Sequence, residues 1–250
     1  MAGARVTVRA EGAVLAGQVR PGESWAGASA RIAAPLGADP VADDLSGDVL
    51  AFVVDPDRRT DLRPMTRGDL PLLARWLAAP HVRRWWRTDG EPTPERVAAT
   101  YGPRIDGTTP TRMWVVEVNG RSIGFVQDYR IREHPEFALL TPNPDAVGLD
   151  YAIGEPGWTG RGLGARVLWS WMVRAARRFP DAEEFFAAPD HRNAASLRIL
   201  DKVGFAQGTW FDEPTSGGSV ATVVGCTLDV RRVVGGAHAA EPGPPPGGPC

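Results

Sequence analysis

The chain has few of the residues and patterns that mark several large classes of protein. Two cysteines, Cys226 and Cys250, and four histidines provide no zinc-ligand spacing, so we expect no metal site. Without a paired-cysteine pattern, a reducing compartment, the cytoplasm, fits better than secretion. No apolar run reaches about 18 residues, the usual length of a membrane span. The first residues also lack the apolar core of a signal peptide, so we expect no membrane partner.

An excess of charge of one sign is also missing. The 250 residues include 28 basic and 30 acidic side chains, a formal net charge of −2, so we expect no nucleic-acid partner. This length is enough for one sizeable core, or for a core domain with an appendage. We therefore expect a soluble globular protein, either a monomer or a homodimer.

Composition and patterning divide the chain into three parts. Residues 1–60 carry short apolar runs separated by Gly, Pro and Asp, which predicts an N-terminal appendage of a few short strands with no assigned role. Residues 61–232 alternate strand and helix patterns, which predicts one α/β domain. Residues 233–250 are rich in Gly and Pro and cannot bury a core, which predicts a disordered tail.

Local signals within 61–232 place the elements. Thr66-x-x-Asp69 predicts a capped helix start, Thr93-Pro94 predicts a second, and Asn119-Gly120 between two apolar runs predicts a hairpin. Further strands are predicted at 147–153, 183–188, 205–213 and 220–230, and helices at 165–179 and 193–203.

The stretch GEPGWTGRGLGARVL (154–168) places five glycines ahead of a helix pattern. A helix start attracts anions because its first N–H groups lack partners, and glycine lets a phosphate oxygen approach the backbone. A Walker loop requires Gly-Lys-Ser/Thr, where this chain reads Gly-Ala-Arg, and the dinucleotide fingerprint requires G-x-G-x-x-G, where it reads G-x-G-x-G. The remaining phosphate-binding type is the pyrophosphate loop of acetyl-CoA-dependent N-acetyltransferases. A glycine-rich turn without a ligand is the alternative.

Four stretches resemble the GNAT acetyltransferase superfamily, and within it the aminoglycoside 6'-N-acetyltransferases. They are RPMTRGDLPLLARWLAAPHVRRWW (63–86), IGFVQDY (123–129), GLDYAIGEPGWTGRGLG (148–164) and NAASLRILDKVGF (193–205). The resemblance implies an α/β (α+β) GNAT-like fold: a central mixed, mostly antiparallel, twisted sheet flanked by helices, with strands splayed at the acyl-CoA site. It also implies an acetyl-CoA-dependent N-acetyltransferase whose acceptor is an amino group of a polycationic small molecule, an aminoglycoside of the antibiotic-resistance type.

The resemblance further implies which residues hold the co-substrate acetyl-CoA. Loop N–H groups would bind the pyrophosphate, with Arg161 and Arg166 as cations. The strand before the loop would pair with the pantetheine arm and polarise the thioester carbonyl. Asn193 would form a hydrogen bond with the same arm. The implied set is Tyr151, Ala152, Ile153, Arg161, Gly162, Leu163, Gly164, Ala165, Arg166 and Asn193. Two positions depart from the family: Thr159 replaces a Gln or Arg, and Leu200 replaces the tyrosine that serves as general acid.

For the acceptor, the resemblance singles out Asp150, which matches an aspartate beside the acceptor amine. An ordinary Asp has a pKa of about 3.9 and is a weak base at neutral pH. The favoured role for Asp150 is therefore to orient the acceptor ammonium, with a proton relay through water. A turn-capping Asp is the alternative. Trp85 and Trp86 match an aromatic pair of the acceptor site, with core packing as the alternative, and Gln127 and Tyr129 match its strand.

The acidic residues of one segment support the same acceptor. Residues 128–155 hold six acids and two arginines, a net charge of −4 that suits a polycationic amine beside the thioester. A solvated charged loop is the alternative interpretation of this segment.

One segment fits a second family. Ala188 stands where aminoglycoside enzymes carry an acceptor-binding aspartate, whereas APDHRN (188–193) resembles the Pro-Asp-x-Arg-Asn motif of siderophore lysine N-acyltransferases. Asp190 is therefore a substrate-binding candidate, with a helix cap as the alternative. Two other functions stay open: a siderophore-type lysine or hydroxylamine N-acyltransferase, and a non-catalytic acyl-CoA-binding module.

Overall fold

The computed structural model describes residues 3–86, 88, 90–134, 143–214 and 220–235, and its described strands form two sheets. The strands are β1 (Arg5–Ala10), β2 (Ala13–Gln18), β3 (Val41–Asp44), β4 (Val49–Val53), β5 (Thr60–Pro64), β6 (Arg112–Val118), β7 (Arg121–Arg130), β8 (Val147–Ile153), β9 (Glu184–Ala187), β10 (Ala206–Pro214) and β11 (Val220–Asp229). The helices are α1 (Trp25–Ala33), α2 (Leu70–Ala78), α3 (Pro80–Arg83), α4 (Pro94–Ile105), α6 (Leu163–Arg178), α7 (Ala194–Lys202) and α8 (Val230–Val233).

The larger sheet has the order β10-β11-β9-β8-β7-β6-β5, and its pairings are antiparallel except between β8 and β9. Helix α6 packs on one face, and α2 and α4 pack on the other, each over its own buried apolar cluster. The sheet is therefore mixed and mostly antiparallel with helices on both faces, as expected.

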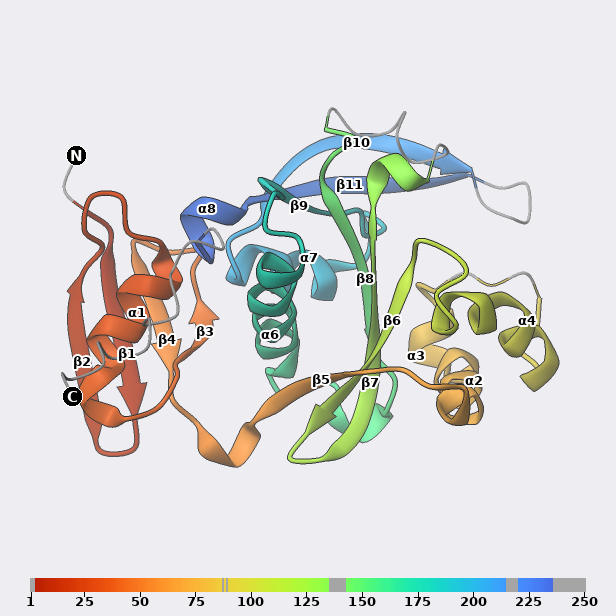
Figure 1. Cartoon of the computed structure of the whole chain (residues 1–250), viewed down its shortest axis with the longest axis horizontal. Coiled ribbons are helices and arrows are strands. Elements are labelled where there is room, and N and C mark those ends of the chain that lie inside the picture. The colour runs from red at the N-terminus through yellow and green to blue at the C-terminus, as the bar shows by residue number, and fades with distance from the viewer. Residues whose placement is uncertain (1–2, 87, 89, 135–142, 215–219, 236–250) are drawn as a thin grey trace, which may run out of the picture.

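Strands β8 and β9 pair over only two residues. The register joins Val147 to Phe185 and Gly148 to Phe186, and no further pair links residues 149–153 to β9. The two strands separate beyond this point (Figure 1). The predicted splay is confirmed, and it frees one backbone edge of β8 for another partner.

The local helix and turn signals are confirmed. Thr66 and Asp69 form the reciprocal capping box ahead of α2, with the Thr66 N–H donating to Asp69 Oδ2 at 2.8 Å. Thr93 caps α4 through its side chain. Asn119 and Gly120 take φ values of 50° and 77°, the left-handed pair that a tight two-residue hairpin turn between β6 and β7 requires.

The smaller sheet comes from the first 60 residues and has the order β2-β1-β4-β3. Its strands β1, β2 and β4 follow the predicted apolar runs, but the sequence analysis missed β3 and the helix α1. The α1 segment is rich in Ala and Gly, so its apolar periodicity is weak, and the helix starts where Ser24 accepts from the Gly27 N–H. Burial against the sheet, with Ala28 and Ala33 fully buried, favours the helix.

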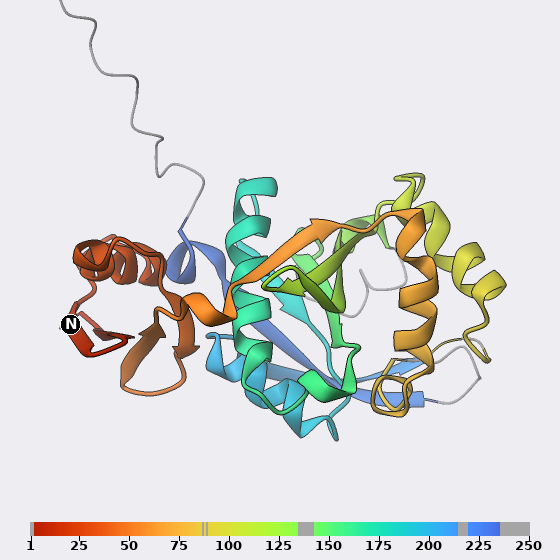
Figure 2. The ribbon, with the colours of Figure 1, turned by 90° about the horizontal axis from the view of Figure 1, so that it is seen from below.

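The small sheet packs against α6, which lies between it and the larger sheet (Figures 1 and 2). The rings of Phe52 on β4 and Trp169 on α6 meet edge to face with centroids 5.3 Å apart, and both belong to one buried apolar cluster. The Ser170 hydroxyl donates to the Thr60 carbonyl at 3.1 Å. Division of the chain at residue 60 remains a prediction, and most of the predicted tail, 236–250, lies outside the described residues.

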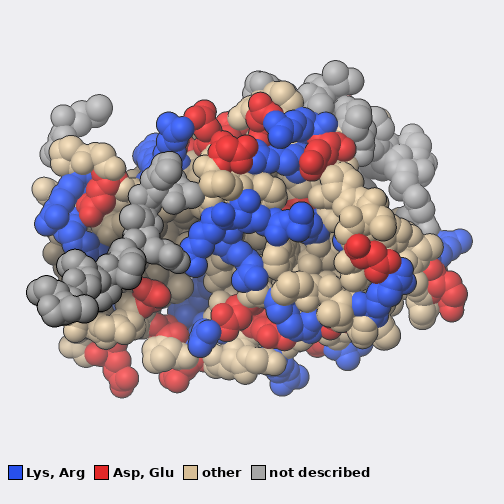
Figure 3. Space-filling view, viewed as in Figure 1, with Lys and Arg blue, Asp and Glu red and all other residues tan. Residues whose placement is uncertain are grey.

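Surface charge is mixed on the face seen in Figure 3. Acidic and basic side chains lie interspersed there, with basic ones gathered in the middle, over α6. Within the described part of the chain, no helix is long and apolar enough to cross a membrane.

Candidate active site

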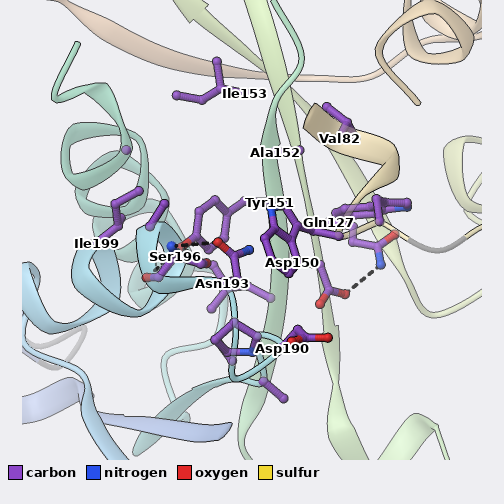
Figure 4. Close-up of a pocket in the computed structure, with 18 of the residues that line it drawn as sticks. Val82, Gln127, Asp150, Tyr151, Ala152, Ile153, Asp190, Asn193, Ser196 and Ile199 are labelled. Carbon is purple, nitrogen blue, oxygen red and sulfur yellow. Dashed lines mark hydrogen bonds between the residues drawn. The ribbon is translucent and has the colours of Figure 1, made fainter. Parts of the chain in front are cut away.

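A cavity of about 1260 Å³ runs along β8 from the start of α6 to α4. One end, here called the loop end, is lined by Thr159, Gly160, Gly162, Leu163, Gly164 and Ala165. The other, here called the carboxylate end, is lined by Trp85, Trp86, Arg104, Gln127, Tyr129 and Asp150. Between them, β8 and the start of α7 face each other (Figure 4).

Two glycines of the loop end are needed for different reasons. Gly162 is the N-cap of α6 with φ of 73°, and a Cβ there would meet nothing within 4 Å, so the left-handed backbone is the requirement. A Cβ on Gly164 would lie 2.5 Å from Ile199 Cδ1, so this glycine lets α6 and α7 pack closely. The backbone at the helix start thus adjoins open space, which leaves its N–H groups accessible to an anion.

The two arginines of the loop point away from the cavity. Arg166 Nη2 pairs with Asp55 Oδ2 at 2.9 Å, and the Arg166 side chain is only 11% exposed. The Arg161 guanidinium lies 5.4 Å from the centre of the Trp158 ring. Neither residue lines the cavity. The expectation that the Arg166 side chain is an available cation is therefore wrong, because an acid from the first 60 residues holds it.

The middle of the cavity is lined by Tyr151, Ala152 and Ile153 of β8, and by residues of the α7 start. The Tyr151 hydroxyl lies 2.6 Å from Ser196 Oγ, and burial raises the pKa of this tyrosine. Asn193 lines the cavity and is also the N-cap of α7, where its Oδ1 accepts from the Ser196 N–H at 3.1 Å.

Asp150 lies in mid-strand, with its side chain on the same face as that of its cross-strand partner Gln127. Gln127 Nε2 donates to Asp150 Oδ2 at 2.8 Å (Figure 4), and the Tyr129 hydroxyl donates to the same oxygen at 3.3 Å. Arg104 Nη1 donates to Gln127 Oε1 at 2.6 Å, so a continuous series of hydrogen bonds links α4 to the Asp150 carboxylate. The turn-cap alternative for Asp150 is excluded by its place within β8.

Burial raises the pKa of Asp150, whereas the hydrogen bonds from Gln127 and Tyr129 and the charge of Arg104 oppose that shift. Within the described residues, Asp150 Oδ1 accepts no hydrogen bond. The carboxylate is therefore fixed in orientation by one oxygen, and its other oxygen remains available to a ligand in the cavity.

Both tryptophans of the predicted pair line the carboxylate end. The Trp86 ring packs edge to face on Phe125 with centroids 4.6 Å apart, and its Nε1 donates to the Tyr101 hydroxyl at 2.8 Å. Trp85 carries the Arg84 guanidinium over its ring at 4.7 Å. Each tryptophan is half-buried, so core packing and contact with the cavity coexist at these positions.

Asp190 also lines the cavity, and it does not cap α7. Its carboxylate accepts from Arg192 Nε at 2.9 Å and Nη2 at 2.8 Å, and only 8% of the side chain is exposed. Because Asn193 is the N-cap of α7, the cap alternative for Asp190 is wrong.

The acids of residues 128–155 are dispersed in the structure. Asp128 is buried and accepts from the Nε1 atoms of Trp114 and Trp171 at 2.7 and 3.0 Å. Asp145 pairs with Arg132 and Glu155 pairs with Arg75, Glu133 is exposed, and Glu136 lies outside the described residues. Asp150 is the one described acid of this segment that lines the cavity, so the described acids do not form the expected acidic loop beside the thioester, and residues 135–142 of the segment lie outside the described part of the chain.

The sequence analysis did not single out several polar side chains of the cavity wall, among them Arg104 and Glu213, and it gave no role to Ser196, which lies in the quoted stretch 193–205. Arg104 and Ser196 lie on helix faces whose direction depends on tertiary packing, and Glu213 lies near the end of β10. No motif marked Arg104 or Glu213. Among the described residues, no three His, Cys, Asp or Glu side chains are grouped to hold a metal ion.

Two curated proteins show the sequence similarity of this chain to known acyltransferases. The aminoglycoside N(6')-acetyltransferase type 1 of Klebsiella pneumoniae is 26% identical over 162 residues, which are 64% of this chain and 80% of the relative. The lysine N-acyltransferase MbtK of Mycolicibacterium paratuberculosis is 25% identical over 143 residues, 57% of this chain and 63% of the relative.

The fold is similar to that of solved acetyltransferases. Aminoglycoside acetyltransferase AAC(6')-Ib in complex with coenzyme A superposes with a TM-score of 0.60 at 24% identity, over 68% of this chain and 95% of the other. Spermidine N-acetyltransferase from Vibrio cholerae in complex with CoA and spermine superposes with a TM-score of 0.54 at 17% identity. The superposition covers 69% of this chain and 96% of the other. The profile of one family, described as "Acetyltransferase (GNAT) domain", matches residues 66–213. Since this match spans more than half of the chain, the chain belongs to the GNAT acetyltransferase family and is an N-acetyltransferase of the GNAT fold.

Proposed function

We propose that this enzyme transfers the acetyl group of acetyl-CoA to a primary amino group of an aminoglycoside. The observation that carries the proposal is the carboxylate of Asp150, which is fixed by Gln127 and Tyr129 in a cavity that continues to the glycine loop. A buried carboxylate with one oxygen facing a cavity suits an ammonium group. The aminoglycoside acetyltransferases among its relatives support the acceptor class.

The residues present fit acetyl-CoA at the loop end. Residues 162–165 at the start of α6 line the cavity, and open space surrounds the backbone at Gly160 and Gly162, which suits a pyrophosphate. Strand β8 has no ladder pairs to β9 beyond Gly148, so its backbone can bond an extended amide arm. When bound, acetyl-CoA supplies the activated thioester. The loss of the family's Gln or Arg at Thr159 leaves phosphate binding to the backbone.

At the other end, Asp150 has two tasks. Its negative charge holds the acceptor ammonium, and its raised pKa makes it a stronger base than an ordinary aspartate. The amine must lose one proton before its lone pair attacks the thioester carbonyl. Trp85 and Trp86 offer ring faces and edges to the apolar surface of a sugar.

Arg104 favours a second candidate function, the siderophore-type acylation of a lysine side chain. It lines the carboxylate end, and within the described part of the chain it pairs with no acid. An arginine there repels a polycation but can bind the carboxylate of an amino-acid acceptor. The match to a lysine N-acyltransferase supports this alternative.

One acceptor panel tests these functions. Thiol release from acetyl-CoA is measured with aminoglycosides, with lysine, with cadaverine (lysine without its carboxylate) and with hydroxylamines, and CoA binding is measured by calorimetry. Aminoglycoside-dependent release supports the proposal. Release with lysine but not cadaverine, abolished in Arg104→Gln, would establish the second function. Tight CoA binding without release to any amine would overturn both and leave a non-catalytic acyl-CoA-binding module.

An aminoglycoside acceptor would make this a resistance enzyme that works in the cytoplasm, where acetyl-CoA is available, as a monomer or homodimer. Expression in a sensitive bacterium should then raise the inhibitory concentration of 6'-amino aminoglycosides and leave that of aminoglycosides without a 6'-amino group unchanged.

A further inference from the structure

Tyr151 and Ser196 form a pair of hydroxyl groups in the middle of the cavity. The Tyr151 oxygen lies 2.6 Å from Ser196 Oγ and 3.4 Å from the Ser196 carbonyl oxygen, and both residues line the cavity. In Figure 4 the tyrosine ring extends from β8 toward α7, where Ser196 and Asn193 lie. Adjacent strand residues point to opposite faces, so Tyr151 leaves β8 on the opposite face from Asp150.

The pair lies on a defined face of α7. Asn193, Ser196 and Leu200 are spaced by three and four residues, so they share one side of the helix. Leu200 also lines the cavity, but it carries no hydrogen-bond donor in its side chain. Leu200 occupies the position of the family's general-acid tyrosine. Ser196, one turn earlier on the same face of α7, therefore carries the hydroxyl donor nearest to that position.

The chemistry of two bonded hydroxyls leaves one proton free. Two hydroxyl groups carry two protons. The Tyr151 hydroxyl also has the Ser196 carbonyl as an acceptor at 3.4 Å, so when Tyr151 donates to Ser196 Oγ and to this carbonyl, the Ser196 proton can point to a third atom in the cavity. Burial raises the pKa of Tyr151, which keeps its proton on the oxygen at neutral pH. The other titratable group that acts on Tyr151 is Cys226, whose pKa is itself raised to about 12 by burial.

We propose that the Tyr151–Ser196 hydroxyl pair donates a hydrogen bond to the sulfur of the departing CoA, in place of the tyrosine that Leu200 replaces. The inference rests on the proposed acetyl transfer. Once the carbon–nitrogen bond has formed, the carbon–sulfur bond breaks and its electron pair passes to the sulfur. The hydroxyl pair stabilises this thiolate, and the proton released by the amine nitrogen ends on the sulfur, giving amide and free thiol.

Two variants test the pair, with a matched control. Tyr151→Phe keeps the ring and removes the hydroxyl, and Ser196→Ala removes its partner. Ser170→Ala is the control, because that serine is also helical but bonds the Thr60 carbonyl and does not line the cavity. The turnover number with the accepted amine should fall about 10- to 100-fold in the first two variants, the effect of one lost hydrogen bond to a charged group. The KM for acetyl-CoA should stay near the wild-type value.

A second readout does not depend on turnover. The thiol pKa of bound CoA is measured from thiolate ultraviolet absorbance, as the difference between complex and free protein. It should rise by about one to two units in Tyr151→Phe, because the bound thiolate loses a donor. Cys226 does not interfere below the alkaline range, since its pKa is about 12.

The outcomes separate this inference from the proposed function. If wild-type protein binds CoA but acetylates no amine, the proposed function fails, and the thiol pKa still tests the pair. Unchanged turnover and unchanged thiol pKa in Tyr151→Phe would overturn the inference. So would a loss confined to CoA affinity, because the pair would then only pack against the cofactor.

Discussion

The two ends of the cavity are built in different ways. The loop end comes from the segment 159–165, and the groups proposed to bind there are backbone N–H donors at the start of α6. The carboxylate end comes from side chains on α4, β7 and β8 and from the two tryptophans that follow α3. A local motif can specify the first end, whereas the second depends on the whole fold. The loop end therefore indicates the family, and the carboxylate end is where we propose that the acceptor is selected.

The sharpest test of the carboxylate end is Asp150→Asn. The amide keeps the shape and can still accept from Gln127, but it removes the charge, so turnover should fall by about two to four powers of ten if Asp150 handles a proton. CoA affinity, measured by calorimetry, should hardly change. Asp145→Asn, which removes an exposed acid paired with Arg132, serves as the control. A loss confined to KM that shrinks at high salt would show attraction of a cation without proton transfer.

The pH dependence of kcat/KM sharpens the same assignment. Because burial raises the pKa of Asp150, this carboxyl binds its proton at a higher pH than an ordinary aspartate. The value of kcat/KM should therefore be full above that raised pKa and fall about tenfold per pH unit below it. The fall should begin at a pH above the usual pKa range of Asp. The acidic limb should disappear from the residual activity of Asp150→Asn. An acidic limb that persists there would assign it to another group.

At the loop end, Gly162→Val should lower CoA affinity about tenfold or more. Valine at a φ of 73° costs about 1–2 kcal/mol of backbone strain, and its side chain would enter the open space beside the helix start. Gly157→Val is the matched control, since that glycine has no positive φ and open space around its Cβ. Turnover at saturating acetyl-CoA should be nearly unchanged. Equal CoA affinity in folded Gly162→Val would remove the loop from the cofactor site.

The smallest effect is expected for Asp190→Asn. Its carboxylate is held by Arg192 and it does not cap α7, so turnover with an aminoglycoside should change by about twofold or less. Steady-state kinetics beside Asp150→Asn would check this. If Asp190→Asn abolished turnover and Asp150→Asn spared it, the siderophore-type function would replace the proposed one.

The sequence predicted the elements of the catalytic part well, because their signals lie within a few residues. The capping box of Thr66 and Asp69 and the turn at Asn119-Gly120 each depend on backbone geometry that the local residues dictate, whereas α6 begins at Leu163, two residues before its predicted start at 165. The sequence analysis failed where burial decides the structure. Helix α1 has a weak pattern of its own and depends on its contacts with the small sheet.

By itself, the sequence determined the family, the glycine loop and the place of Asp150 in a strand, since these follow from short-range patterns. The tertiary structure alone decided the partners of the charged groups: Arg166 pairs with Asp55, 111 residues away, and Asp128 is buried between two tryptophans. It also brought Tyr151 within hydrogen-bond distance of Ser196. Side-chain direction depends on which elements pack together, and distant contacts leave no periodic signal in one sequence.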